Sequence, residues 1–201
     1  LSQDVQGEVF EYPEDFFKER IHTIRRPKPD DYQIKEAAEF IKKSKKPLII
    51  SGGGVFYSDA TDELSAFAIK HNIPVSQTVM GYSTMKKDHS HYLGAIGGLG
   101  GRAANNLSKE TDMAIAIGTK LADFTTGSWT NFENPNFKLV SINAARFDAN
   151  KHMAQAVVGD AKVSLIELSQ ALGNWKSDDS WYKKSRIELK NWESYVDKES
   201  G

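Results

Sequence analysis

Short apolar runs that end in glycine or a small polar residue recur along this chain, and they constrain its fold most. The clearest run covers residues 112–118, between an acidic residue and a glycine. Runs over residues 47–51, 139–143 and 156–160 have the same form. Strands that are buried on both sides read in this way, because neither of their faces meets water. We therefore predict an α/β fold, a doubly wound, Rossmann-like parallel sheet of about six strands with helices on both faces.

Helical segments separate most of these runs, because their apolar residues recur at the spacing of one helix face. The sequence predicts helices over residues 30–43, from 58 or 61 to 71, over 102–109 and over 161–172. Asp30 or Asp31 is the expected N-cap of the first helix. Ser58 or Thr61 is the expected N-cap of the second. Residues 74–77 form one more short strand.

The two ends of the chain differ from the middle, which we take as one central domain over residues 30–173. Apolar residues in residues 1–29 do not recur at a sustained spacing, and prolines stand at 27 and 29. This predicts an extended inter-domain connector whose aromatic side chains pack on a surface. Residues 174–201 form a helical arm or linker. The first residue is not methionine, which indicates a piece of a longer protein.

The charged C-terminal arm also carries an apolar stripe. Its members share roughly one helix face and are Trp181, Leu189, Trp192 and Val196. An apolar stripe needs a partner surface, and a part of a longer protein that is missing here is one candidate. On this reading the chain could also act as a subunit-interaction domain.

Composition excludes several classes of partner and chemistry. The 201 residues carry a formal charge of -1, so the chain has no positive electrostatic field that would attract nucleic acid or an anionic membrane. No apolar run approaches the ~18 residues of a membrane span. The chain has no cysteine, which removes disulfides and thiolate metal sites and fits a reducing compartment, so we expect a cytoplasmic protein.

Gly52, Gly53 and Gly54 directly follow the first strand, where backbone amides can approach a phosphate closely. The match to a dinucleotide fingerprint is partial. Tyr57 replaces the third glycine, and the second strand ends at Gln77 instead of an acidic residue. Either the run belongs to a nucleotide site, or it only permits tight packing, which is the favoured interpretation.

A second glycine cluster contains Gly98, Gly100 and Gly101 and leads into a helix whose N-terminal amides could hold an anion. Residues 91–93 before it make a poor strand, which favours an ordinary glycine-rich loop. His89 and His91 would project to the same side of an extended segment and could serve a metal, but a solvated loop is favoured.

Lys120 and Asp123 follow the best strand, at the edge where open α/β sheets bind their ligands. Nothing in the spacing assembles a nucleophile, a base and an oxyanion hole. We therefore predict no catalytic residue and no metal ligand in this chain. His22, His71 and His152 are expected to be packing or surface residues.

An ordered series of segments carries a family resemblance. The series is Pro47–Gly54, Ile73–Val75 with Met80–Gly81, Asp112–Gly118, Ser141–Asn143 and Val158–Asp160. It resembles the central domain of thiamine-diphosphate-dependent enzymes of the acetohydroxyacid synthase and pyruvate oxidase superfamily over about residues 30–172. The entering segment is similar to the connector of hydrolases that open a cyclic 1,2-diketone in myo-inositol breakdown; its matching parts are Asp4–Glu8, Tyr12–Pro13, Phe16–Phe17 and Arg20–His22.

The resemblance implies that thiamine diphosphate and Mg²⁺ bind outside this chain, in flanking pyrimidine-binding and diphosphate-binding domains. Gly159–Asp160 is followed by Ala161, without the motif that holds the Mg-diphosphate. The chain alone should then be inactive, and the whole enzyme a homodimer or homotetramer. A carboligase or decarboxylase sibling and a stand-alone nucleotide-binding module, such as an NAD-dependent deacylase, remain alternatives.

Relatives hold FAD or an ADP group in this domain, with arginines after the fourth strand. Here Lys120 stands where arginine is usual, and lysine lacks the planar fork of arginine. The resemblance therefore implies a vestigial pocket without FAD. Its members would be Gly52, Gly53, Gly54, Gly98, Gly100, Gly101, Gly118, Lys120, Asp123 and Asn143.

Overall fold

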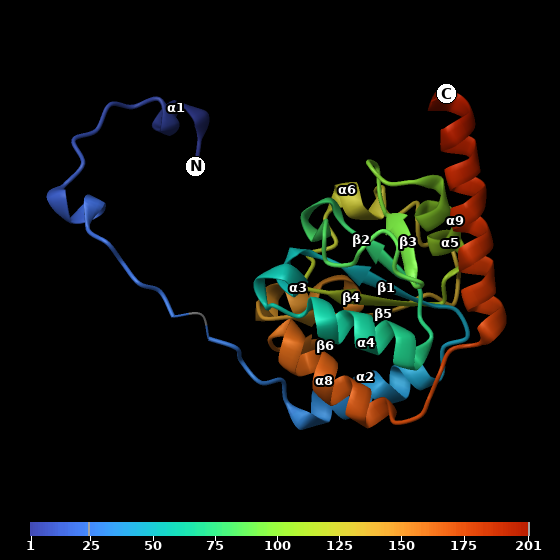
Figure 1. Ribbon diagram of the computed structural model, residues 1–201. Coiled ribbons are helices and arrows are strands. Elements are labelled where there is room, and N and C mark those ends of the chain that lie inside the picture. Colours follow the sequence, from blue (N-terminus) through green and yellow to red (C-terminus); the bar gives the residue numbers. More distant parts are fainter. Residues whose placement is uncertain (24, 201) are drawn as a thin grey trace.

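A parallel sheet forms the centre of the protein in the computed structural model, which describes residues 1–23 and 25–200 (Figure 1). Six strands in these ranges pair in the order β3-β2-β1-β4-β5-β6, and all neighbours are parallel. They are β1 (Pro47–Ser51), β2 (Val75–Gln77), β3 (Tyr92–Ala95), β4 (Met113–Ile117), β5 (Lys138–Asn143) and β6 (Gln155–Val158). The order reverses between β1 and β4, which confirms the predicted doubly wound, Rossmann-like fold.

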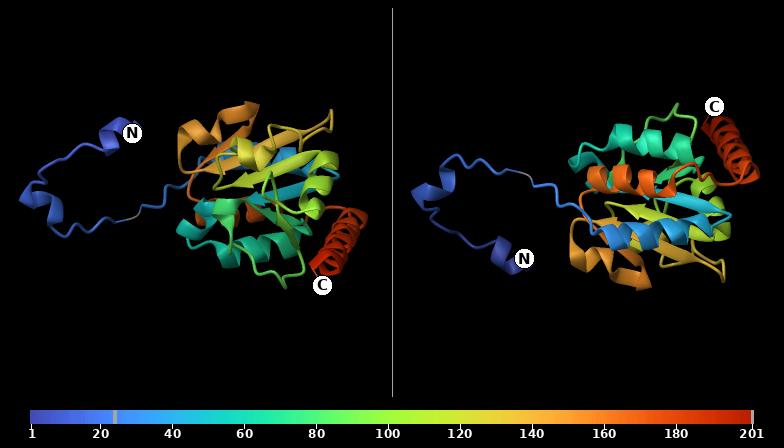
Figure 2. Two further views of the ribbon diagram at one scale, coloured as in Figure 1. Left: turned by 90° about the horizontal axis from the view of Figure 1, so that it is seen from above. Right: turned by 90° about the horizontal axis from the view of Figure 1, so that it is seen from below.

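Helices cover both faces of the sheet (Figure 2). The larger core packs the sheet against α2 (Asp31–Lys42), α4 (Thr61–His71) and α8 (Ala161–Leu172). The second core packs it against α5 (Arg102–Glu110) and α9 (Asp179–Ser200). Short helical turns complete the chain: α1 (Gln3–Gln6), η1 (Glu14–Phe17), α3 (Gly53–Tyr57), η2 (Val79–Gly81), α6 (Asp123–Thr126), α7 (Arg146–Ala149) and η3 (Lys151–Met153).

The first two long helices agree with the sequence pattern except at one cap. Asp30 is the N-cap of α2, and its carboxylate accepts from the backbone N–H of Tyr32 at 2.9 Å. The predicted cap of α4 was wrong, because Ala60 is at that position and the described structure shows no side-chain cap bond there. The inward-facing residues of α4 are as predicted: Leu64, Phe67, Ala68 and His71.

The sequence pattern missed strand β3. It lies at the edge of the sheet, and its register against β2 shifts between Val75 and Ser76. Gly94 within it has φ of +102°. A short edge strand that contains such a glycine has few apolar positions, which explains the weak pattern at residues 91–93.

Helix α9 finds its partner surface within this chain. Trp181 and Leu189 are buried in the second core, and Trp192 packs against the same core. Indole Nε1 of Trp181 donates to the carbonyl of Pro47 at 2.8 Å. The expectation of an external partner is therefore wrong for these three residues, while Val196 stays partly exposed.

The N-terminal segment leads away from the sheet and its helices (Figures 1 and 2). Residues 1–23 are exposed throughout. Their aromatic rings contact one another instead of the domain, as in the pair of Tyr12 and Phe16 at 4.7 Å between centroids. None of the helices in the described ranges has the length and apolar character that a membrane crossing requires.

Candidate functional site

The strand order reverses between β1 and β4, and a cavity of about 320 Å³ opens there at the carboxyl edge of the sheet. Loops after β1, β2, β3 and β4 line it. The lining residues are Gly53, Gly54, Tyr57, Thr78, Val79, Met80, Ile96, Gly118, Thr119, Lys120, Ala122, Phe124 and Thr125. The fold thus brings together four of the predicted site residues, which are Gly53, Gly54, Gly118 and Lys120.

The glycines after β1 and β4 allow two loops to touch through their backbones. A Cβ atom on Gly52 would lie 2.4 Å from the carbonyl oxygen of Gly118. A Cβ atom on Gly118, which has φ of +61°, would lie 2.5 Å from Cα of Gly54. The N–H of Gly52 donates to Ile117 at 2.8 Å and that of Gly54 to Gly118 at 2.9 Å. These two amides are therefore committed to the fold and do not face a ligand.

Two further glycines bring the loop after β2 against the same turn. A Cβ on Gly53 would lie 2.9 Å from the carbonyl oxygen of Met80. A Cβ on Gly81 would lie 2.1 Å from the carbonyl oxygen of Ser51. Gly81 was not among the site residues predicted from the sequence. Its position shortly after the second strand was the signal that could have identified it.

Large apolar side chains surround the cavity. Tyr57, Val79, Met80 and Phe124 line it and are exposed. Lys120 is the one charged residue among the described residues of the lining. This apolar rim was not predicted from the sequence, although each member follows closely after the end of a predicted strand. An apolar rim with one cation is poorly suited to a diphosphate, which needs several donors.

Asp123 and Asn143 brace loops beside the cavity and are not part of its lining. The carboxylate of Asp123 accepts from Ser128 Oγ at 2.9 Å. The Nδ2 of Asn143 donates to the carbonyl of Thr119 at 3.3 Å. Asn143 therefore holds the loop that carries Lys120, and Asp123 closes the turn after α6.

The glycines of the second cluster do not line this cavity and instead make close backbone and helix contacts. A Cβ on Gly100 would lie 2.5 Å from the carbonyl oxygen of Ala95, and one on Gly101 would lie 2.7 Å from Nε1 of Trp192. The N–H of Gly98 donates to the carbonyl of Phe124 at 2.8 Å. These glycines shape the loop on which α5 begins and against which α9 packs.

His91 is buried, so the expectation that it lies in a solvated loop was wrong. Its ring packs on Tyr182 of α9 at 4.6 Å between centroids. Ser90 Oγ lies 2.9 Å from its Nδ1, and Asn72 Oδ1 lies 3.4 Å from its Nε2. Burial lowers the pKa of His91 to about 4, and the nearby His89 and Arg186 add to the effect.

We expect acid to weaken the fold through His91. Its depressed pKa of about 4 means that the unfolded chain binds the proton more tightly, so stability is full above pH 6.5 and falls as the pH drops towards 4. The loss is roughly 3 kcal/mol for this group. Urea unfolding of the parent and of His91→Gln between pH 7.5 and 4.5 measures it.

His91→Gln should reduce the slope of stability against pH. Some slope will remain in His91→Gln, because burial also lowers the pKa of His71. Equal slopes in the parent and His91→Gln would contradict the role of His91.

Neither the histidines nor Asp160 form a metal site. Within residues 1–23 and 25–200, no group of three or more His, Asp or Glu side chains is placed to hold a metal ion. The carboxylate of Asp160 accepts from the N–H of Lys162 at 3.0 Å and contacts Arg26 at 3.2 Å. Because these contacts occupy it, Gly159–Asp160 does not fit a Mg-diphosphate site.

Comparison with known proteins gives a consistent result. The family model for the thiamine pyrophosphate enzyme central domain matches residues 34–168. A Clostridium perfringens protein named 3D-(3,5/4)-trihydroxycyclohexane-1,2-dione hydrolase is 43% identical over 190 residues, which are 94% of this chain and 30% of the relative.

Two further relatives carry the same name. The one from Clostridium botulinum strain Alaska E43 is 47% identical over 172 residues, 86% of this chain and 27% of its own. The one from Bacillus licheniformis is 45% identical over 178 residues, 89% of this chain and 28% of its own. The chain therefore spans less than a third of the length of these relatives.

Proposed function

This chain belongs to the family of thiamine pyrophosphate enzyme central domains, and from this premise we propose that it serves an enzyme that hydrolyses 3D-(3,5/4)-trihydroxycyclohexane-1,2-dione. One observation carries the proposal. The identity of 43% to the Clostridium perfringens hydrolase extends over 190 residues, well beyond the residues 34–168 that the family model matches. The likeness therefore includes segments outside the part that the family shares.

The proposed role of this domain is to join and space the domains that carry the chemistry. Residues 1–29 are the connector, residues 30–173 the central domain and residues 174–201 its helical arm. Thiamine diphosphate and Mg²⁺ would be held by flanking domains of the longer protein. In this chain Asp160, which belongs to the one Gly-Asp pair considered for the Mg-diphosphate, is already engaged in capping α8. The complete enzyme would be a cytoplasmic homodimer or homotetramer of myo-inositol catabolism.

The experiment that tests the function uses the full-length protein that contains this chain. We expect thiamine-diphosphate-dependent ring opening of trihydroxycyclohexane-1,2-dione, and no acetolactate from pyruvate. The isolated chain of 201 residues should show no turnover with either substrate. Acetolactate formation by the full-length protein would favour a carboligase instead, and turnover by the isolated chain would refute the non-catalytic role.

The cavity at the carboxyl edge is proposed to hold no flavin. The backbone N–H groups of Gly52 and Gly54 donate to backbone carbonyls and cannot bind a ligand. Lys120 is the one cation among the described lining residues. Calorimetric titration of the chain with FAD and with ADP should give no saturable heat up to about 1 mM ligand. Any binding would then have a Kd above about 1 mM, which corresponds to a binding free energy weaker than roughly -4 kcal/mol. Binding at micromolar concentrations that Lys120→Ala abolishes would contradict this expectation.

A further inference from the structure

Two charged side chains of the connector, residues 1–29, engage the central domain. The ammonium of Lys28 lies 3.2 Å from Glu167 of α8, and Arg26 makes the more buried of the two contacts. Its guanidinium Nη1 lies 3.2 Å from Oδ2 of Asp160 and also donates to the carbonyl of Ser58. The side chain of Asp160 is only 6% exposed, whereas that of Arg26 is 36% exposed. Residues 1–23, in contrast, are exposed along their whole length.

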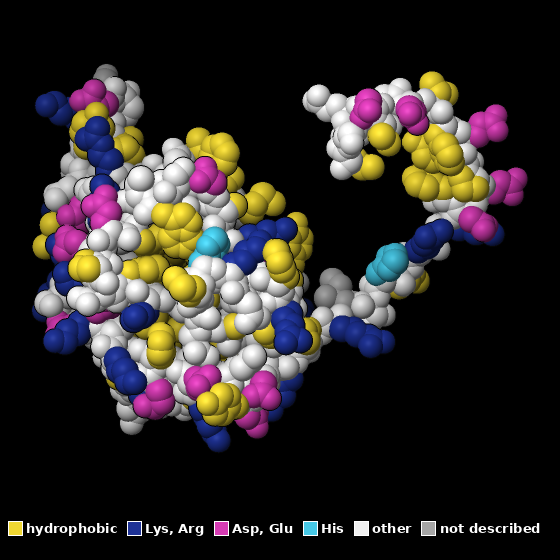
Figure 3. Space-filling model, turned by 180° about the vertical axis from the view of Figure 1, so that it is seen from behind, with side chains coloured by type: hydrophobic (Ala, Val, Ile, Leu, Met, Phe, Trp, Pro, Cys, Tyr) yellow, Lys and Arg dark blue, Asp and Glu magenta, His cyan; other side chains and the backbone are white. Residues whose placement is uncertain are grey.

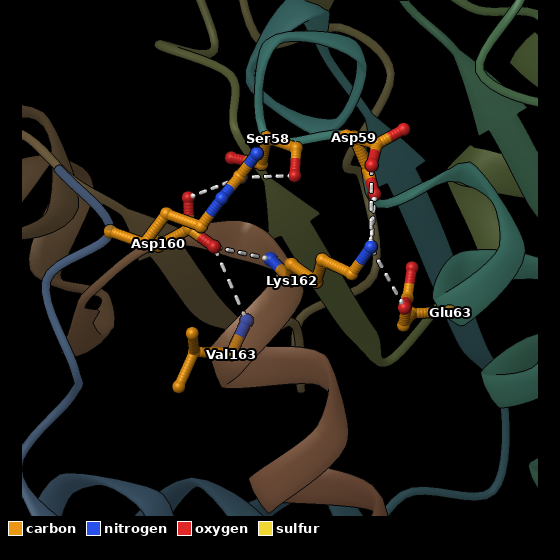
Figure 4. Close-up of polar contacts among 7 residues, drawn as sticks. Ser58, Asp59, Glu63, Asp160, Lys162 and Val163 are labelled. Carbon is orange, nitrogen blue, oxygen red and sulfur yellow. Dashed lines mark hydrogen bonds and ion pairs between the residues drawn. The ribbon is translucent and has the colours of Figure 1, made fainter. Parts of the chain in front are cut away.

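Asp160 is itself held rigidly, because it is the N-cap of α8. Its Oδ1 accepts from the backbone N–H groups of Lys162 at 3.0 Å and Val163 at 3.3 Å (Figure 4). Its own N–H donates to the carbonyl of Pro27 at 2.8 Å. Asp160 therefore binds the connector through both its side chain and its backbone, while its position is set by the helix.

The residues next to Arg26 continue this attachment. A Cβ on Gly159 would lie 2.9 Å from Cδ of Pro29, so the connector lies directly against the turn before α8. Pro27 and Pro29 have fixed φ angles, which limits the directions that the chain can take there. The carbonyl of Ser58 belongs to the end of α3, so Arg26 also ties α8 to the glycine turn after β1.

A separate ion-pair group beside it provides a comparison. The ammonium of Lys162 lies 3.4 Å from Asp59 and 3.3 Å from Glu63, and it links α8 to α4 without touching the connector (Figure 4). The same end of α8 thus carries two charged contacts. One joins parts of the central domain to each other, and the other joins the domain to the connector.

We propose that Arg26 and Asp160 form a clamp that fixes the direction in which the connector leaves the central domain. The clamp thereby holds the preceding domain in the orientation that the active site of the complete enzyme requires. This catalytic consequence rests on the proposed function, whereas the clamp itself does not. Arg26 is a positioning residue, because it acts through the connector and not on the substrate.

A distance measurement on this chain tests the clamp. The chain has no cysteine, so spin labels can be placed at Thr23→Cys, which is exposed, and at Lys183→Cys on α9, whose side chain is 71% exposed. We expect a narrow distance distribution in the parent and a broad one in Arg26→Ala and Asp160→Asn. Asparagine caps helices about as well as aspartate, so Asp160→Asn removes the charge while keeping α8 capped.

Lys162→Gln is the matched control, and its distribution should equal that of the parent. Arg26→Lys should give a distance distribution of intermediate width, between that of the parent and that of Arg26→Ala, since lysine keeps the charge but not the fork of donors. A broad distribution in the parent, or one in Arg26→Ala as narrow as in the parent, would overturn the clamp.

The consequence for catalysis is measured in the full-length protein. Misplaced groups commonly cost about 10²-fold in rate, so Arg26→Ala should lower kcat at least about tenfold, with Arg26→Lys intermediate and Lys162→Gln near the parent. A kcat of Arg26→Ala equal to that of the parent would overturn the positioning role. If the parent does not hydrolyse the diketone, the proposed function fails, and the distance distributions still decide the clamp.

Discussion

Gly118→Ala is expected to destabilise the domain by about 3 kcal/mol or more, one of the two largest effects of a single substitution that we anticipate. Gly118 has φ of +61°, and an added Cβ would lie 2.5 Å from Cα of Gly54 and 2.8 Å from the backbone nitrogen of Val55. Backbone atoms cannot move aside as a flexible side chain can. The loops after β1 and β4 would therefore separate, and chemical denaturation measures the loss.

Gly173→Ala is the matched control for this substitution. Gly173 has φ of +62°, but a Cβ there would meet nothing within 4 Å in the described structure. It therefore incurs only the backbone cost, which is on the order of 1–3 kcal/mol because its ψ of -119° lies outside the left-handed helical region. The difference between the two variants isolates the close contact of the loops. Equal losses of stability in both variants would show that this contact carries no energy of its own.

Trp181→Ala should cost about 3 to 5 kcal/mol, because it empties a buried aromatic site and removes a hydrogen bond. Trp181 is 3% exposed and donates to the carbonyl of Pro47 at 2.8 Å. Loss of the Trp181 side chain should detach α9 from the second core and expose that core to water. Urea unfolding followed by near-ultraviolet circular dichroism measures both the stability and the packing.

Ile187→Ala on the same helix serves as the control, since Ile187 is exposed. It should change stability by less than about 0.5 kcal/mol. If Trp181→Ala were as mild as this control, α9 would not be an integral part of the domain, and its contacts with α5 would be incidental.

Figure 3 shows the side of the domain opposite to the view of Figure 1, where a histidine lies between apolar side chains and basic ones. A cavity in the domain brings together Phe40, Trp129, Phe137, His152 and Met153. The rings of Trp129 and His152 are 4.5 Å apart. No local pattern predicted this group, because its members come from α2, from η3 and from loops that meet only when the sheet forms.

Local patterns predicted the secondary structure well where burial is uniform. Strands β1 and β4 are buried at every position, so their apolar runs identified them. Strand β3 escaped because it lies at the sheet edge and contains Gly94. The cap of α4 was missed since Ala60 is at that position, and alanine gives no capping signal.

The sequence by itself determined most of the strands and helices, all strands except β3, and with them the fold class, because the period of apolar residues depends only on local geometry. The tertiary structure decided what the glycines do. Whether Gly52 and Gly54 face a phosphate or a neighbouring loop depends on where Gly118 lies, 64 or more residues later. It also decided that α9 packs on this domain and that Arg26 meets Asp160, since contacts between distant segments have no periodic signature.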